Sequence, residues 1–193
     1  MSAFSEAFPG VRHVFLPVIH TLNHGQAVIN ARIAFDEGAD GVFLINHEIS
    51  PDYLVDCYEV VRSTYPDKWI GVNFLRLFGD DIDDALDLML AGMSGLWSDD
   101  GGIDIDADQP ASRAGEFARR RKPWERFNSP FLYFGGVAFK GQRPVKDLRR
   151  AVELATPFVD VITTSGSATG VAPDVERLRA LQEAARDHPV AHA

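Results

Sequence analysis

Short apolar segments recur along the chain and alternate with segments that have the periodicity of amphipathic helices. The apolar segments span residues 13–20, 41–46, 69–75, 95–99, 131–139 and 159–166. Their apolar residues run continuously, as expected of strands that are buried on both faces of a parallel sheet. Helical periodicity follows over residues 26–39, 52–65, 82–93, 112–127, 145–158 and 174–187. This pattern predicts an α/β protein in which a strand and a helix alternate six times.

Several boundaries of the predicted helices have their own sequence signals. Ser50 stands before Pro51, which is typical of a serine N-cap followed by a proline in the first turn. Asp174 follows Pro173 in a similar helix start. Gly38 ends an earlier helix, because a residue without Cβ adopts the left-handed conformation of a helix C-terminus most easily.

The joints between these elements favour a TIM-barrel-like (β/α) repeat over an open sheet. Joints after helices are short, whereas joints after strands vary and hold most of the Gly, His, Asn, Ser and Asp residues, as expected when one rim binds a ligand. The first strand is not followed by G-x-G-x-x-G, the dinucleotide-binding turn of many open sheets. We therefore predict one domain over residues 1–193.

The length of the chain limits how much of a barrel it can form. Eight units typically need about 250 residues, and this chain has 193. We expect about six complete units, with residues 188–193 starting a seventh strand, and we expect the last one or two strands of an eight-fold barrel to be lacking. The open edge would then be covered by another copy, so the chain is predicted to form a homo-oligomer.

Charge and cysteine content exclude several classes of function. The formal net charge of -9 argues against binding to nucleic acid, which needs a basic surface. Cys57 is the single cysteine, so no intramolecular disulfide can form and a reducing compartment is expected. The chain has no run of about 18 apolar residues and no basic leader before an apolar segment. We expect a cytoplasmic protein without a membrane span.

Three segments resemble the BtpA/SgcQ family of TIM-barrel proteins. They are GVNFLRL at 71–77, LWSDDGGIDIDADQ at 96–109 and DVITTSGSATGVAPDVERLRALQEA at 160–184. Family members are similar in a strand that ends in V-N-x-L-R and in a late strand that ends in T-G-S-A-T-G before a Pro-Asp helix start. The resemblance implies a barrel fold and either an uncharacterised enzyme or a factor for photosystem I biogenesis. Members continue through a seventh and an eighth strand, which this chain does not match.

In a barrel, the carboxyl ends of the strands share the rim that binds ligands. The predicted catalytic residues on this rim are Asp99, Asp100 and His20. The predicted ligand-binding residues are Asn46, Glu48, Asn73, Arg76, Lys140, Thr164, Ser165, Gly166, Ser167, Thr169 and Gly170. Asp99 and Asp100 would act as general acid or base, or would bind Mg²⁺; solvated loop carboxylates are the alternative. No other cofactor is predicted.

Two further motifs leave alternatives open. The turn from Thr164 to Gly170 could hold an anion or a sugar hydroxyl edge, or its hydroxyls could cap the following helix. Gly135 and Gly136 inside a strand indicate close approach of another backbone or of a ligand. The spacing D-x-D-x-D at 104–108 lacks the glycine and the glutamate that a calcium loop needs, so no calcium site is predicted.

These observations predict an enzyme that binds a small polar ligand, phosphorylated or of nucleoside type, at the carboxyl ends of the strands. The sequence does not indicate the reaction. The alternative is a non-catalytic assembly or stability factor that acts through protein–protein contacts.

Overall fold

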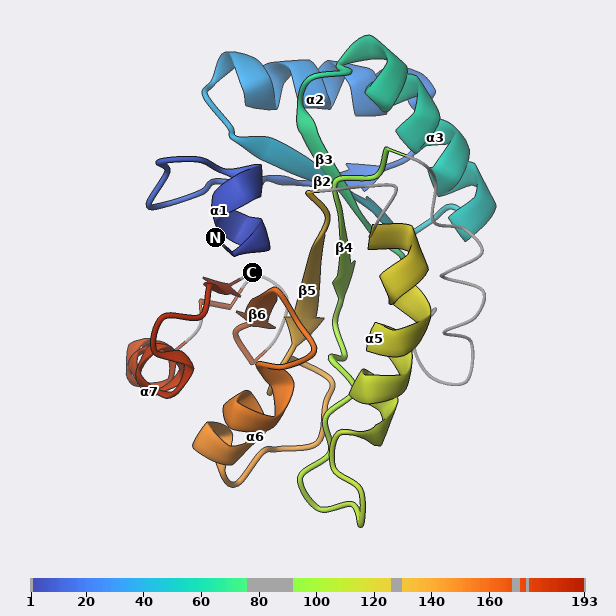
Figure 1. Ribbon diagram of the computed structural model, residues 1–193. Coiled ribbons are helices and arrows are strands. Elements are labelled where there is room, and N and C mark those ends of the chain that lie inside the picture. Colours follow the sequence, from blue (N-terminus) through green and yellow to red (C-terminus); the bar gives the residue numbers. More distant parts are fainter. Residues whose placement is uncertain (1, 76–91, 126–129, 168–170, 173, 193) are drawn as a thin grey trace. The chain divides into compact units, whose positions relative to one another are not determined.

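The computed structural model describes residues 2–75, 92–125, 130–167, 171–172 and 174–192. The predicted helix over 82–93 lies almost wholly outside these residues. The chain divides into two compact units, one formed by Met1–Trp97 and Pro123–Phe131, the other by Ser98–Lys122 and Leu132–Ala193. Figure 1 shows the elements of both units in sequence colours.

The first unit contains parallel strands that follow one another in chain order. These are β1 (Val18–Thr21), β2 (Gly41–Asn46), β3 (Trp69–Asn73) and β4 (Gly95–Ser98), whose last residue is assigned to the second unit. Thr21 lies opposite Asn46, and Asn73 lies between Ile45 and Trp97. Polar residues therefore end β1, β2 and β3, as the sequence pattern predicts.

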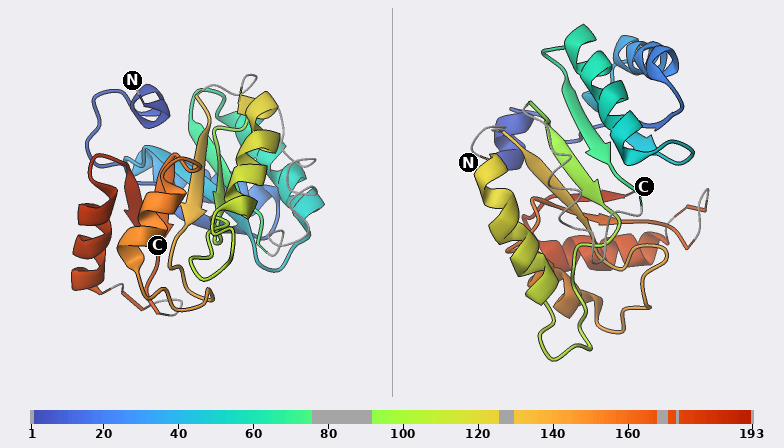
Figure 2. Two further views of the ribbon diagram at one scale, coloured as in Figure 1. Left: turned by 60° about the horizontal axis from the view of Figure 1, so that its bottom comes forward. Right: turned by 90° about the vertical axis from the view of Figure 1, so that its right-hand side faces the viewer.

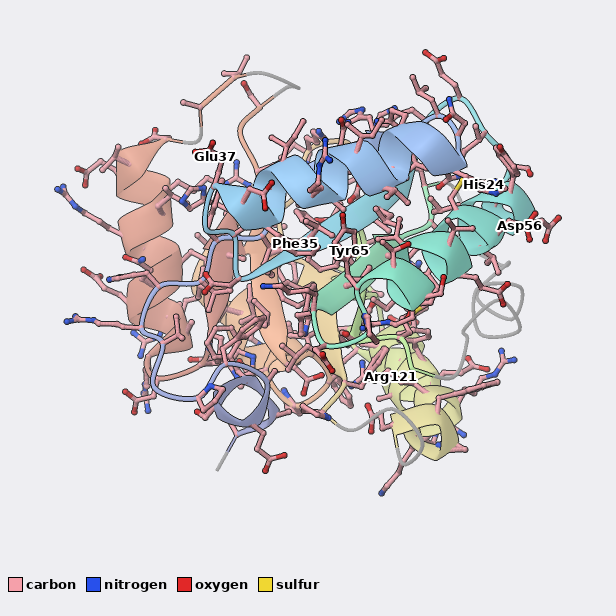
Figure 3. All side chains as sticks on the ribbon, turned by 90° about the horizontal axis from the view of Figure 1, so that it is seen from above. His24, Phe35, Glu37, Asp56, Tyr65 and Arg121 are labelled. Atoms are coloured by element: carbon pink, nitrogen blue, oxygen red, sulfur yellow. The ribbon has the colours of Figure 1, made fainter. Side chains whose placement is uncertain are left out.

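The helices of the first unit are α1 (Ala3–Ala7), α2 (His24–Asp36) and α3 (Pro51–Thr64). Helices α2 and α3 lie side by side, and Phe35 and Tyr65 meet edge to face with ring centroids 5.1 Å apart (Figures 2 and 3). The predicted start of α3 is confirmed, because the Ser50 side chain accepts a hydrogen bond from the Tyr53 amide and Pro51 occupies the first turn.

The core of the first unit is aromatic. All six residues of β2 are buried, and the ring of Phe43 meets the rings of Trp69 and Trp97 edge to face at 5.0 and 5.2 Å. The first strand begins later than predicted, at Val18 and not at residue 13. Pro17 has no N–H for a sheet ladder, and the Phe15 amide bonds the Asp40 carboxylate instead of a strand.

The second unit repeats the same succession of elements. Its strands β5 (Leu132–Gly136), β6 (Val161–Thr164) and β7 (Val190–His192) are parallel and follow chain order. Its helices are α5 (Ser112–Glu125), whose last three residues are assigned to the first unit, α6 (Leu148–Ala155) and α7 (Val175–Ala185). Helices α6 and α7 lie side by side.

The described residues thus hold seven strands, each parallel to its partners within its unit, and a helix follows β1, β2, β4, β5 and β6. This α/β arrangement agrees with part of a TIM barrel. The seventh strand, expected to start within residues 188–193, is β7. Short helix α1 has no counterpart among the predicted helices. In the part of the chain that the structure describes, no helix is long and apolar enough to cross a membrane.

Candidate functional site

A hydrogen-bonded turn follows β4 and presents the carboxylate of Asp100. The Ser98 hydroxyl donates to the Asp100 carbonyl at 2.6 Å and accepts from the Asp100 amide at 3.1 Å. The Asp100 Oδ1 atom accepts from the Gly102 amide at 2.8 Å. Short polar side chains close turns in this way, and Gly102 has the positive φ of +77° that glycine adopts without strain. The sequence therefore specifies the turn locally.

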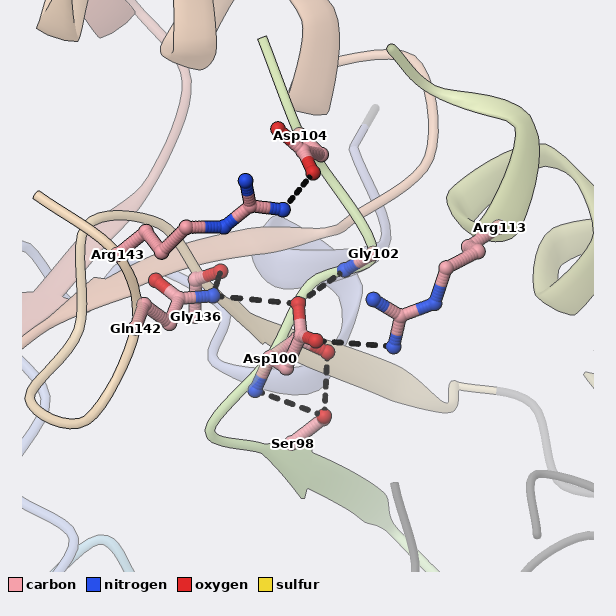
Figure 4. A network of polar contacts seen from close by, with 8 residues as sticks. All are labelled: Ser98, Asp100, Gly102, Asp104, Arg113, Gly136, Gln142 and Arg143. Carbon is pink, nitrogen blue, oxygen red and sulfur yellow. Dashed lines mark hydrogen bonds and ion pairs between the residues drawn. The ribbon is translucent and has the colours of Figure 1, made fainter. Parts of the chain in front are cut away.

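Two side chains from other elements bind the same carboxylate. Arg113, near the start of α5, donates from Nη2 to Asp100 Oδ2 at 2.9 Å. Gln142, in the segment after β5, donates from Nε2 to Asp100 Oδ1 at 3.2 Å. Figure 4 shows both side chains pointing toward Asp100. Both carboxylate oxygens of Asp100 are thus engaged, which suits a carboxylate that orients its neighbours.

Gln142 is itself held in one orientation. Its Oε1 atom accepts from the Phe139 amide at 2.7 Å, and its Nε2 atom also donates to the Gly136 carbonyl at 3.3 Å. Because the carbonyl side of the amide is occupied, the amino side must face Asp100. The segment after β5 is thereby tied to the turn after β4.

A pocket of about 130 Å³ opens beside this network, within the second unit. Its wall carries two guanidinium groups, because Arg113 pairs with Asp100 and Arg143 pairs with Asp104. The other residues that line it are Ile103, Ile105, Asp106, Gln142, Pro144 and Val145. Arginine donors of this kind recognise carboxylate and phosphate groups.

Among the described residues, no group of three or more His, Cys, Asp or Glu side chains is arranged to hold a metal ion. The predicted Mg²⁺ therefore has no ligand set in this part of the chain. Asp99 is half-buried at the carboxyl end of β4, and its backbone carbonyl faces Gly136.

Tyr133, in β5, is a buried titratable residue of the second unit. Burial raises the pKa of Tyr133 to about 12, and Arg121 and a side-chain hydrogen bond with Ser98 oppose this effect in part. The Arg121 guanidinium lies 4.5 Å from the centre of the Tyr133 ring, and the Phe117 ring lies 4.7 Å away. The Tyr133 amide donates to the Asp160 carboxylate at 2.8 Å. These contacts fix the ring between β5 and α5.

The Thr/Ser/Gly turn binds the chain itself at the positions that the structure describes. The buried Ser165 hydroxyl accepts from the Lys140 amide at 2.9 Å and lies 3.0 Å from the Gly166 carbonyl. A Cβ on Gly166 would stand 1.8 Å from the Val171 carbonyl oxygen. The close approach at this glycine is therefore that of the protein backbone. Ser167 is exposed, and Thr169 and Gly170 lie outside the described residues.

This turn does not supply the N-cap of the next helix either. The cap of α7 is Asp174, which accepts from the Glu176 amide at 2.8 Å. Thr164 is buried, and its hydroxyl lies 3.5 Å from the Ala138 carbonyl. The hydroxyls of Thr164 and Ser165 thus contact the segment after β5, a partner that neither of the two alternatives named.

The paired glycines of β5 match the prediction of a close backbone approach. A Cβ on Gly136 would stand 2.0 Å from the Asp99 carbonyl oxygen, and the Gly101 amide donates to the Gly136 carbonyl at 2.8 Å. At Gly135 the neighbour is the side chain of Val159. Lys140, which follows β5, is exposed, and its Nζ lies 5.8 Å from the centre of the Phe139 ring.

The remaining candidates belong to the first unit. His20 and His47 are exposed and stack with ring centroids 4.5 Å apart and planes within 6°. The Asn46 side chain joins two backbone segments. Its Oδ1 atom accepts from the Leu75 amide at 2.8 Å, and its Nδ2 atom donates to the Ile49 carbonyl at 3.3 Å. Two further candidates are Glu48, which is exposed, and Asn73, which is buried. Arg76 lies outside the described residues.

The first unit also has a shallow depression of about 540 Å³ along β1 and α2. His20 lines this depression together with the exposed apolar side chains of Phe15, Val18 and Ile33. Such a surface is compatible with the predicted self-association, which stays a prediction.

Sequence reasoning missed Arg113, Gln142 and Arg143. Arg113 is 13 residues from Asp100, and Gln142 is 42 residues from it. No local pattern marks these residues, because each reaches the site only through the packing of α5 or of the segment after β5 onto the turn.

Comparison with known proteins shows similarity in fold. No family model matches the chain, and no curated protein matches it. A mandelate racemase/muconate lactonizing protein from Herpetosiphon aurantiacus is similar with a TM-score of 0.57 and 14% identity, over 100% of this chain and 50% of that one. An enolase from Mycobacterium smegmatis, complexed with tartrate, has a TM-score of 0.57 and 15% identity, over 93% of this chain and 41% of that one.

A provisionally assigned mandelate racemase from Bordetella bronchiseptica RB50, complexed with 2-oxoglutarate/phosphate, has a TM-score of 0.59 and 16% identity, over 94% of this chain and 45% of that one. The chain thus spans half or less of the length of these proteins. At such low identity the likeness establishes the fold alone.

The family assignment made from sequence motifs is wrong. The similar structures include a mandelate racemase/muconate lactonizing protein, a mandelate racemase and an enolase, and no family model matches. The Thr/Ser/Gly motif has a local cause, because Ser165 binds the Lys140 amide and Gly166 admits the Val171 backbone. Such requirements can arise wherever a barrel strand meets its loop, so the motif is no proof of common descent. The alternative role as an assembly factor relied on this resemblance and loses that support.

Proposed function

We propose that the protein is an enzyme whose ligand is a small organic anion, bound through a carboxylate or phosphate group in the pocket beside Asp100. The observation that carries this proposal is the pair of guanidinium groups on the pocket wall, each held by an aspartate. Arginine is suited to this task because its planar fork of donors matches the oxygens of carboxylate and phosphate.

The two arginines would contribute differently. Arg113 binds Asp100 through Nη2, and within the described residues its other nitrogens make no hydrogen bond, so they are available to a ligand. The Arg143 side chain is 79% exposed, and its pair with Asp104 is therefore held weakly in water. Arg143 can turn from Asp104 to a ligand at little cost, whereas Arg113 provides a fixed anchor.

The carboxylates of the pocket set a condition on the ligand. Asp100, Asp104 and Asp106 line the same wall, so an anion must approach through the arginine donors and keep its charge away from the aspartates. Both carboxylate oxygens of Asp100 accept hydrogen bonds, so we assign to Asp100 the role of orienting the Arg113 side chain. Of the two aspartates predicted from sequence to act as acid or base, Asp99 keeps this role as a prediction; it is half-buried and does not line the pocket.

The similar structures support this class of ligand. One was obtained with tartrate and another with 2-oxoglutarate/phosphate. All of these compounds carry carboxylate or phosphate groups.

The test is binding of tartrate, 2-oxoglutarate and inorganic phosphate, measured by isothermal titration calorimetry. Arg113→Gln should weaken binding by about tenfold or more, since a hydrogen bond to a charged group contributes about 1.5 to 3 kcal/mol. Arg119→Gln is the matched control, because Arg119 is exposed on the same helix and does not line the pocket. The proposal is refuted when the wild-type protein binds none of the three compounds at millimolar concentration, or when the two variants bind equally well.

A further inference from the structure

The charges on the wall of the pocket beside Asp100 do not balance. Among the described residues, three carboxylates and two guanidinium groups line this pocket. Asp100 pairs with Arg113 at 2.9 Å. Asp104 pairs with Arg143. The third carboxylate belongs to Asp106, which pairs with neither arginine. The wall therefore has one negative charge in excess.

Asp106 also differs from the other two aspartates in its hydrogen bonds. Both oxygens of Asp100 accept hydrogen bonds from the protein. Asp104 accepts from the Asp106 amide through Oδ1 at 3.2 Å and binds Arg143 through Oδ2. The Asp106 carboxylate makes no such bond within the part of the chain that the structure describes, and the residue is exposed. A ligand can therefore bind this carboxylate without displacing a donor of the protein.

A ligand that carries acid groups alone does not match this distribution of charge. The guanidinium groups of Arg113 and Arg143 attract its carboxylates, but the unpaired charge of Asp106 repels them. A positively charged ammonium group on the same ligand would replace this repulsion by a charge-assisted hydrogen bond to Asp106. Two guanidinium groups and one unpaired carboxylate thus suit a ligand with two acid groups and one ammonium group.

The pocket also has an aliphatic part. Ile103, Ile105 and Val145 line it, and all three are half-buried. Methylene groups of a ligand lose contact with water when they pack against such side chains, which favours binding. Inorganic phosphate has no group that could use this surface. The pocket therefore suits a ligand whose charged groups are joined by a short hydrocarbon chain.

We infer that the ligand of this site is an acidic amino acid, whose carboxylates bind Arg113 and Arg143 and whose ammonium group binds Asp106. This inference rests on the proposed function, because it names the class of anion that the pocket takes. Asp106 is then the residue that determines specificity, since it separates amino acids from plain dicarboxylates. All of these side chains belong to the second unit.

The experiment compares three ligands that differ at one position of the same carbon chain. L-Glutamate, 2-hydroxyglutarate and glutarate have the same two carboxylates, and carry an ammonium group, a hydroxyl group or a hydrogen at the carbon beside one of them. Their affinities are measured by isothermal titration calorimetry at pH 7, where the carboxylates and the ammonium group are charged. We expect glutamate to bind about fivefold more tightly than either of the others, the upper range for an exposed ion pair.

Asp106→Asn tests the residue to which this preference is assigned. The variant should bind glutamate about as weakly as glutarate, whereas its affinity for glutarate should stay unchanged or rise because a repulsion is removed. Asp108→Asn is the matched control, because Asp108 is exposed in the same segment, carries the same charge and does not line the pocket. The preference for glutamate should persist in this control. A merely structural effect of Asp106→Asn would weaken the binding of both ligands together.

The outcomes separate this inference from the proposed function. If glutarate binds and Arg113→Gln weakens its binding, but glutamate binds no better or its preference survives in Asp106→Asn, the site is real and the ligand class is overturned. If 2-hydroxyglutarate binds as tightly as glutamate, Asp106 selects a hydroxyl group, and the inference is overturned as well. If the wild-type protein binds none of these ligands, nor tartrate or phosphate, both are overturned.

Discussion

A methyl group added at Gly136 should destabilise the protein strongly, because the backbone of Asp99 occupies the space. In Gly136→Ala the new Cβ would stand 2.0 Å from the Asp99 carbonyl oxygen and 2.5 Å from its carbonyl carbon. Close carbon–oxygen contacts begin at about 3.3 Å, so the two backbones must separate by about 1.3 Å. Both neighbours are backbone atoms, so no side-chain rotation can relieve the overlap.

The size of the effect follows from two contributions. Overpacking of a well-packed interior costs about 1 to 3 kcal/mol. A displacement of this size is also enough to break the hydrogen bond from the Gly101 amide to the Gly136 carbonyl, now 2.8 Å long, at a cost of about 1 kcal/mol. We expect a loss of about 3 kcal/mol in the free energy of unfolding, or about 6 to 12 °C in Tm for a chain of this size.

Urea unfolding followed by circular dichroism measures this loss, with Gly115→Ala as the control. Gly115 lies inside α5, where an added Cβ would have Phe158 Cε1 at 3.5 Å, an ordinary contact. Alanine should stabilise that helix by about 0.5 to 1 kcal/mol. The same change thus has opposite signs at the two positions. A Gly136→Ala protein within about 0.5 kcal/mol of the wild type would refute the reasoning.

Two predictions concern pH. Burial raises the pKa of Tyr133 from 10.0 to about 12, so its contribution to stability is fully present below pH 10 and falls by about 3 kcal/mol as pH rises through 12. Urea unfolding across this pH range should show this loss in the free energy of unfolding for the wild type and a smaller loss for Tyr133→Phe. An equal loss in the two proteins would contradict the prediction. Burial lowers the pKa of His188, whose Nε2 atom has no hydrogen-bond partner among the described residues. The neutral His188 side chain contributes to the free energy of unfolding above pH 6.5, and this contribution is lost as pH falls through the lowered pKa of the folded state. Between pH 7 and pH 5, His188→Gln should therefore lose less stability than the wild type in urea unfolding. A loss as large as that of the wild type would argue against this role.

Much of the fold could be predicted because the signals are local. The six apolar residues of β2 are consecutive, and all of them are buried. The Ser50-Pro51 pair starts α3 where the sequence indicates, since the serine hydroxyl caps a backbone amide three residues later. The start of β1 was predicted too early, at residue 13, and this difference also has a local cause. Pro17 has no N–H for a sheet ladder, and the strand begins after it.

The candidate site was predictable only at its centre. Ser98, Asp99 and Asp100 follow a buried strand, and polar residues at such positions indicate a rim. The turn itself is closed by groups that are close in sequence, because Ser98 binds Asp100 and the Asp100 carboxylate accepts from the Gly102 amide. The sequence alone therefore established an α/β chain with a polar turn after β4.

Only the tertiary structure decided what that turn can do. The partners of Asp100 come from α5 and from the segment after β5, and a one-dimensional pattern holds no record of which distant side chains will meet. The same reason explains the wrong family assignment, which relied above all on the motif around Ser165 and Gly166. The Ser165 hydroxyl accepts from the Lys140 amide and donates to the Gly166 carbonyl, and the Val171 backbone occupies the space beside Gly166. Residue type shows what a group can bind, whereas the packing of the chain determines what it does bind.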